Sequence, residues 1–176
     1  MSLHRNHHSE PSHSGSALVP NPPTPAAPIP TPPVPTPRGP ILTTGTSQLR
    51  VRYCECDPMG VVHHASYVPW LEIGRTEILR DCGVTYADLE RSGVFLVIVK
   101  LEVRYRRPVL YDDVVQVRTT VTGGSRVKIE HDYELVITER ASKPYTETAA
   151  VATTTLACVD HNGKIQALPS WLAGRA

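Results

Sequence analysis

The chain has 176 residues and a nearly balanced charge, with 18 Lys and Arg against 17 Asp and Glu. No basic stripe accompanies this balance, which argues against a nucleic-acid partner. No run of about 18 apolar residues occurs, and the N-terminus lacks the apolar core of a secretory signal, so we expect no membrane span. We therefore expect a cytoplasmic protein whose four cysteines are reduced thiols.

The first part of the chain has an unusual composition. Residues 1–46 hold 12 of the 17 prolines and only three Arg, Lys, Asp or Glu side chains. Such a segment favours extended polyproline geometry and buries little apolar surface. We expect residues 1–46 to form a disordered, proline-rich leader and residues 47–176 to form one folded domain of ordinary size.

Two periodic patterns follow this leader. Leu49, Val51 and Tyr53 alternate with other side chains, which predicts a half-buried strand that ends at a turn over residues 57–60. After the turn the period becomes that of a helix, with Gly83 as its expected C-cap. The stripe on one face of this predicted helix consists of Tyr67, Trp70, Leu71, Gly74 and Ile78.

The cysteines of the predicted strand raise the question of a metal. Cys54 and Cys56 are two residues apart, so they are expected to face the same side of the strand, and His63 and His64 follow closely. The spacing of these four residues is not a recognised zinc pattern. We expect no metal ion or other cofactor.

The rest of the chain is rich in β-branched residues. A short helix is expected at residues 86–91, followed by strands at residues 94–104, 114–122, 127–137 and 147–159. The turns between these strands are expected at residues 111–113, 123–125 and 142–144. The order of strand, long helix and four strands predicts an α+β domain in which a mostly antiparallel sheet packs on one long helix.

The first of those four strands presents a row of apolar side chains. One helix cannot cover every face and edge of such a sheet, so we expect the protein to form a homodimer or a homotetramer. The side chains expected on one side of this strand are those of Val97, Val99, Leu101, Val103 and Tyr105.

Asp57 lies in a Pro/Gly turn just ahead of the predicted helix start. There, a carboxylate can act as a base or a nucleophile, while unpaired N–H groups at the helix start polarise a carbonyl group. This arrangement suits acyl transfer. The simpler alternative is that Asp57 only stabilises its own turn, since Asp-Pro is common turn chemistry.

The segment at residues 56–67, together with Trp70-Leu71-Glu72, resembles the signature of hotdog-fold acyl-CoA thioesterases. It is similar to the 4-hydroxybenzoyl-CoA thioesterase family, and within it to the YbgC-like branch. The resemblance covers about residues 49 to 170 and leaves the leader outside. It implies a hotdog fold, a sheet wrapped on a central helix, and the hydrolysis of an acyl-CoA thioester to a free acid and CoA without a cofactor.

The resemblance also assigns catalytic positions. It makes Asp57 the catalytic carboxylate, which either attacks the thioester carbon or activates water. The backbone N–H of His64, at the start of the helix, is implied to hold the thioester oxygen, and the His64 side chain is a candidate for proton transfer. Tyr67 either borders the acyl pocket or packs in the core.

For the nucleotide part of CoA, the resemblance implies contacts from Ser125, Arg126 and Lys128. Arg126 and Lys128 are expected to share one strand face, although a solvated strand edge would explain them equally well. This basic cluster is thin, which leaves open a thioester carried by acyl carrier protein. Arg106 and Arg107 are candidates for contact with that acidic partner.

Two other functions are compatible with the same residues. A hydroxyacyl-thioester dehydratase would pair His64 with Glu72, although we expect Glu72 to be a partner of Arg75 instead. A non-catalytic hotdog dimer would use its leader to recruit a protein with a polyproline-binding groove. His131 lies on an apolar strand face and is expected to be a core or interface histidine.

Overall fold

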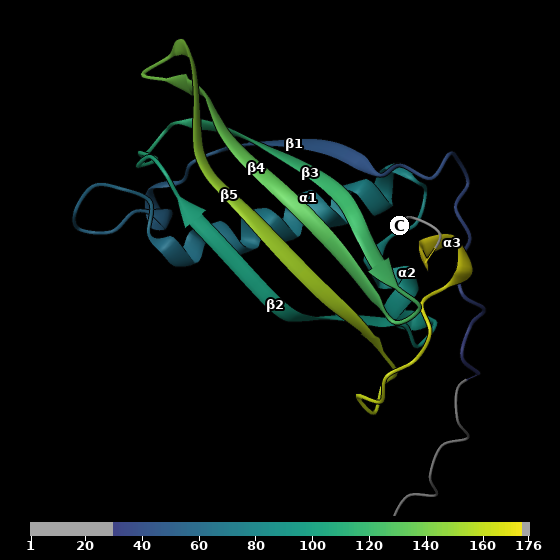
Figure 1. Cartoon of the computed structure of the whole chain (residues 1–176). Helices are drawn as coiled ribbons and strands as arrows, with labels where there is room; N and C mark the ends of the chain where they lie inside the picture. Colours follow the sequence, from purple (N-terminus) through teal and green to yellow (C-terminus); the bar gives the residue numbers. More distant parts are fainter. Residues whose placement is uncertain (1–29, 174–176) are drawn as a thin grey trace, which may run out of the picture. The chain divides into compact units, whose positions relative to one another are not determined.

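The structure is a computed structural model that describes residues 30–173. The disorder expected for residues 1–29 lies outside this range. Within it, five antiparallel strands form one sheet in the order β1-β3-β4-β5-β2, and the long helix α1 packs against one face (Figure 1). The predicted α+β architecture is confirmed.

The strands are β1 (Thr44–Arg50), β2 (Phe95–Tyr105), β3 (Val114–Ser125), β4 (Lys128–Arg140) and β5 (Lys143–Val159). The helices are α1 (Tyr67–Asp81), α2 (Tyr86–Arg91) and α3 (Ser170–Ala173), with short 3-10 turns η1 (Tyr53–Glu55) and η2 (His64–Ser66). The prediction of α2 is therefore confirmed to the residue, and those of α1 and of the last four strands to within a few residues.

The first strand differs from the prediction. It runs from Thr44 to Arg50, so it begins three residues before the expected start of the domain and ends well before Asp57. The chain leaves the sheet because the Val51 N–H donates to the Asp113 carbonyl and residues 53–55 then coil into η1. The expectation that Cys54 and Cys56 share a strand face is wrong for this reason.

Helix α1 lies unusually close to the sheet at Gly74. A Cβ atom added to Gly74 would lie 2.3 Å from the Thr119 Oγ1 and 3.1 Å from the Val117 Cγ1, both on β3. Only glycine permits this approach without a shift. The predicted stripe is confirmed, since its side chains and those next to it are buried: Tyr67, Trp70, Leu71, Gly74, Arg75, Ile78 and Leu79.

Strand β2 is an edge of the sheet and exposes apolar side chains. A register shift between Ile98 and Lys100 interrupts the alternation along the strand, so the predicted single row of five residues is broken there. Val99 is 54% exposed. The other exposed large apolar side chains on β2 are those of Val97, Ile98, Leu101 and Tyr105.

Two further findings limit the possible roles of the described residues. Across residues 30–173, the structure has no helix that is both long enough and apolar enough to span a membrane. Over the same range, no three His, Cys, Asp or Glu side chains cluster in a way that could hold a metal ion.

Candidate active site

The Asp57 turn is closed by backbone hydrogen bonds. The Asp57 N–H donates to the Val61 carbonyl at 2.9 Å, and the Gly60 N–H donates to the Asp57 carbonyl at 2.9 Å. Gly60 has φ +78°, a conformation that favours glycine. One carboxylate oxygen of Asp57 accepts the Met59 N–H at 2.8 Å. The turn therefore fixes the carboxylate, and its second oxygen accepts no hydrogen bond from residues 30–173.

An open cleft of about 350 Å³ lies beside this carboxylate. It brings together three of the predicted site residues, Asp57, His64 and Tyr67. The remaining lining residues are Val61, Val62, Tyr105, Arg106, Arg107 and Pro108. The two arginines therefore border the same cleft as Asp57, and Arg107 also pairs with Glu147 at 2.5 Å.

The backbone N–H of His64 differs from those on either side of it. The His63 N–H donates to the Glu55 carbonyl at 2.8 Å, and the Ala65 N–H donates to the His63 Nδ1 at 3.2 Å. The His64 N–H has no acceptor among residues 30–173. An N–H group in this state at the start of a helix can donate to an oxygen that gains negative charge.

A buried carboxylate joins the Asp57 loop to α1, and the sequence analysis missed it. Glu55 is 7% exposed, and its side chain accepts hydrogen bonds from the Arg52 N–H, the Arg52 guanidinium and the Trp70 indole N–H, at 2.8, 2.8 and 2.9 Å. Its carbonyl also accepts the Ser66 hydroxyl at 3.1 Å. Burial acts to raise the pKa of Glu55, but the hydrogen bonds from Arg52 and Trp70 outweigh it and lower this pKa.

Two tyrosines form the apolar wall of the cleft. The rings of Tyr67 and Tyr105 meet edge to face, with centroids 4.9 Å apart. Burial, with a smaller effect from Tyr105, raises the pKa of Tyr67 to about 12, so Tyr67 stays neutral. The Tyr105 hydroxyl donates to the His64 carbonyl at 3.2 Å. Tyr67 thus packs in the core and borders the cleft, while Tyr105 is a lining residue that the sequence analysis did not identify.

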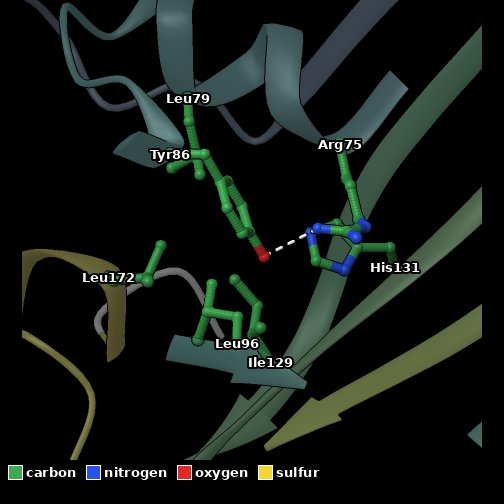
Figure 2. A pocket seen from close by; sticks show the side chains of 7 residues that line it. All are labelled: Arg75, Leu79, Tyr86, Leu96, Ile129, His131 and Leu172. Carbon is green, nitrogen blue, oxygen red and sulfur yellow. Dashed lines mark hydrogen bonds between the residues drawn. The ribbon is translucent and has the colours of Figure 1, made fainter. Parts of the chain in front are cut away.

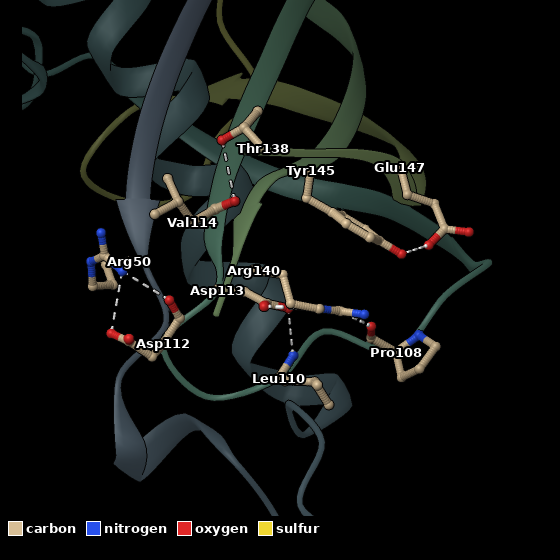
Figure 3. A network of polar contacts seen from close by, with 10 residues as sticks. All are labelled: Arg50, Pro108, Leu110, Asp112, Asp113, Val114, Thr138, Arg140, Tyr145 and Glu147. Carbon is tan, nitrogen blue, oxygen red and sulfur yellow. Dashed lines mark hydrogen bonds and ion pairs between the residues drawn. The ribbon is translucent and has the colours of Figure 1, made fainter. Parts of the chain in front are cut away.

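A polar network holds the other side of the cleft (Figure 3). The Arg140 guanidinium contacts the Asp113 carboxylate at 2.6 Å and the Pro108 carbonyl at 3.0 Å. Asp113 is 1% exposed and also accepts the Leu110 N–H at 2.9 Å. The carbonyl of Val109, the residue after Pro108, accepts the N–H of Val62 from the Asp57 loop at 2.8 Å. The network therefore fixes residues 108–110 against the Asp57 loop.

The predicted nucleotide contacts lie elsewhere in this chain. Ser125 ends β3, Lys128 begins β4, and Arg126 lies in the turn between them. The expectation that Arg126 and Lys128 share a strand face is therefore wrong. On β5, Lys128 pairs with Ala157, whereas Tyr105 of the cleft pairs with Ala150. The two pairing positions are seven residues apart along β5. Within one chain these residues are about 23 Å from the cleft along the sheet.

Glu72 is not part of the cleft. Its side chain is 60% exposed and pairs with Arg75 at 3.0 Å, as expected from the sequence. Arg75 also donates to the Tyr86 hydroxyl at 2.6 Å in a small internal cavity that His131 lines (Figure 2). His131 is 6% exposed, which confirms its prediction as a core histidine.

Comparisons with known proteins agree with this architecture. The profile of the Thioesterase-like superfamily matches residues 51–175. The Bacillus subtilis protein named "Putative acyl-CoA thioesterase YneP" is 33% identical over 129 residues, which cover 70% of this chain and 89% of that protein. Acyl-CoA thioester hydrolase YbgC of Escherichia coli is 39% identical over 75 residues, which cover 43% of this chain and 56% of that protein.

Solved structures give the same result. The DHNA-CoA thioesterase of Staphylococcus aureus superposes with a TM-score of 0.65 at 30% identity, over 71% of this chain and 80% of that one. The 4-hydroxybenzoyl-CoA thioesterase of Pseudomonas sp. strain CBS-3 has a TM-score of 0.66 at 20% identity, over 77% of this chain and 100% of that one, and supports the fold alone. The predicted hotdog fold is confirmed, and the chain belongs to the Thioesterase-like superfamily.

Proposed function

We propose that the protein hydrolyses acyl-CoA thioesters to a free acid and CoA. The observation that carries this proposal is the meeting of Asp57 and His64 at one cleft, where the His64 N–H has no acceptor within the described part of the chain. The thioester carbonyl oxygen accepts the His64 N–H, which stabilises the negative charge that develops on that oxygen. Such a donor typically contributes about 3–4 kcal/mol to transition-state stabilisation.

Asp57 acts on the carbonyl carbon by one of two routes. In the first, the carboxylate attacks the carbon, the C–S bond breaks with its electrons on CoA thiolate, and water then hydrolyses the mixed anhydride. In the second, the carboxylate takes a proton from water as the water attacks the carbon, and the C–S bond then breaks with its electrons on CoA thiolate. A thiolate is a good leaving group, so neither route requires a strong acid beside the sulfur.

We also propose that the active unit is a homodimer joined along β2. This edge strand exposes apolar side chains and has unpaired backbone groups, which antiparallel pairing with a second copy would cover. If the two-fold axis lies near Leu101, Val97 of the partner subunit lies opposite Tyr105 of the cleft.

This pairing accounts for the distant basic residues. Ala157 of β5 pairs with Val97 of β2 on one side and with Lys128 of β4 on the other. Lys128 is therefore two strand spacings, about 10 Å, from Val97. Ser125 pairs with Lys128, and Arg126 follows in the turn. We propose that these three residues of the partner subunit contact the CoA bound in the cleft.

The four cysteines form no disulfide, and Cys54 is exposed as a free thiol. Free thiols suit a reducing compartment, which supports a cytoplasmic location. Glu72 forms an ion pair with Arg75 and does not line the cleft that His64 lines. This arrangement does not favour a dehydratase that pairs Glu72 with His64.

The test is a substrate panel with the full-length protein. Free thiol release is measured for short, long and aryl CoA thioesters and for matched acyl carrier protein thioesters, with enoyl products monitored in parallel. We expect free thiol from at least one CoA thioester class and no enoyl product. Enoyl product without free thiol, or no turnover of any thioester, would overturn the proposal.

A further inference from the structure

The described end of the proline-rich leader lies along the domain. We call residues 31–43 the proline segment. The Trp171 indole N–H donates to the Pro35 carbonyl at 3.0 Å, and the Arg38 N–H donates to the Cys82 carbonyl at 3.1 Å. The Leu42 N–H lies 3.3 Å from the Cys82 Sγ. The segment is therefore held by α3 at one point and by the end of α1 at two others.

The segment also packs closely on Gly83, which follows α1. A Cβ atom added to Gly83 would lie 3.1 Å from the Arg38 Cβ and 3.3 Å from the Arg38 N. Gly83 has φ +81°, so it both ends the helix and leaves room for the chain that crosses it. The backbone of Arg38 therefore lies in close contact with Gly83.

Five residues of the segment border a cleft on the side of α2. A cleft of about 330 Å³ lies between the segment and α2, where Asp88 and Arg91 line it. A polyproline helix has three residues per turn, so positions three apart share a face. The lining positions form two such faces, Pro32, Pro35 and Arg38 on one and Pro33 and Thr36 on the other. Val34, on the third face, is 42% exposed.

The composition of the segment explains why it can bind with little loss of entropy. Proline fixes φ, and a residue before proline is restricted to extended conformations. Every residue from 31 to 37 meets one of these conditions, so the free segment already favours the bound shape. Its carbonyls have no partner within a polyproline helix, so the carbonyl of Pro35 can accept the indole N–H of Trp171.

We propose that this surface is a polyproline-binding site that the chain fills with its own proline segment. Its walls are Trp171, the Cys82–Gly83 turn after α1, and the α2 residues Asp88 and Arg91. The ligand that fits it is a proline-rich strand with a carbonyl opposite the indole N–H and side chains at three-residue spacing. This site lies outside the catalytic cleft and does not depend on thioester hydrolysis.

Occupation of the site fixes α3. Trp171 and Leu172 are neighbours in that four-residue helix, and Leu172 is 1% exposed. Leu172 lines the small internal cavity that Arg75, Tyr86 and His131 also line (Figure 2). The proline segment therefore holds α3 in the position that closes this cavity.

Amide hydrogen exchange in the full-length protein tests the site. Trp171→Phe keeps an aromatic ring but removes the indole donor. We expect the Arg38 and Leu42 amides, and the Leu172 amide of α3, to exchange about fivefold faster, as the loss of one hydrogen bond of about 1 kcal/mol implies.

Tyr145→Phe is the matched control. It removes one side-chain hydrogen bond, from the Tyr145 hydroxyl to Glu147, near the start of β5. We expect it to leave the three amides unchanged. The proposal would be overturned if each of the three amides exchanged at the same rate in Trp171→Phe as in the parent. It would also be overturned if these amides exchanged in the parent at the rate of an unstructured chain.

A second experiment tests the ligand itself. The double variant Pro32→Ala and Pro35→Ala removes two conformational restraints, and we expect the segment amides to exchange about tenfold faster. Val34→Ala, on the third face, should have little effect. A peptide of residues 31–40, added at millimolar concentration, should then bind the double variant and shift the Trp171 indole resonance. A peptide that causes no shift in the double variant would contradict the assignment.

Discussion

The indole N–H of Trp70 donates to the buried carboxylate of Glu55 at 2.9 Å. Trp70 lies in the first turns of α1, and Glu55 lies two residues before Asp57. The same carboxylate accepts two hydrogen bonds from Arg52, so one side chain joins the Asp57 loop to α1, which directly follows the turn η2 that contains His64. In the proposed mechanism, this contact positions Asp57 relative to the His64 N–H.

Trp70→Phe should therefore lower both stability and turnover. The variant keeps most of the ring packing but leaves the Glu55 carboxylate with one donor fewer. We expect a loss of about 1–3 kcal/mol in the free energy of unfolding, measured by urea denaturation, and a fall in kcat larger than any rise in KM. Trp171→Phe removes an indole hydrogen bond at α3, outside the cleft, and serves as the matched control. Unchanged kcat in folded Trp70→Phe would refute the positioning role.

The pH dependence of stability should report the charge of Glu55. Its pKa is lowered in the folded protein, so its carboxylate adds stability above its ordinary pKa of about 4.3 and loses that stability as pH falls through the lower folded value. Parent and Glu55→Gln should then differ most in unfolding free energy above about pH 5, and the difference should shrink below about pH 4. A difference that stays constant from pH 3 to 7 would contradict this account.

Gly74→Ala should separate α1 from β3. The added Cβ meets the Thr119 Oγ1, so we expect a destabilisation of about 1–3 kcal/mol in chemical denaturation. The Thr119 hydroxyl is buried and has no hydrogen-bond partner among residues 30–173, so Thr119→Ala alone should cost little. Combining the two changes should recover most of the loss. Purely additive effects would show that the close approach is not the cause.

The edge strand β2 gives a prediction about assembly. Val99→Lys places a charge on the exposed apolar surface of β2 and should convert the proposed dimer to monomers with greatly reduced hydrolysis, as measured by light scattering and thiol release. Ile165→Lys changes a residue that is 64% exposed elsewhere and should leave the assembly intact. Fully active Val99→Lys monomers would exclude a shared active site.

The sequence predicted the elements whose side chains follow a local period. The stripe on α1 gave the helix and its buried face, and the β-branched runs gave β2 to β5. Gly83 marked the helix end correctly because a positive φ at that point favours glycine. These features depend on neighbours within one or two turns, which a sequence pattern records.

The missed features depend on contacts between distant residues. The end of β1 is set by the Val51 and Asp113 backbone groups, and the role of Glu55 by Trp70, fifteen residues away. No local pattern distinguishes Glu55 from an exposed acidic residue. The turn at Arg126 was misplaced because β3 continues past its glycines with an irregular register between Val121 and Gly123.

Asp57→Asn tests the central claim most directly. The change removes the charge and nearly keeps the shape, and Asp81→Asn, at the end of α1, is the matched control. With unfolding free energies close to the parent value, we expect thiol release from the preferred acyl-CoA to fall about 100-fold or more in Asp57→Asn and to stay unchanged in Asp81→Asn. A folded Asp57→Asn variant that hydrolyses acyl-CoA at the parent rate would contradict the account.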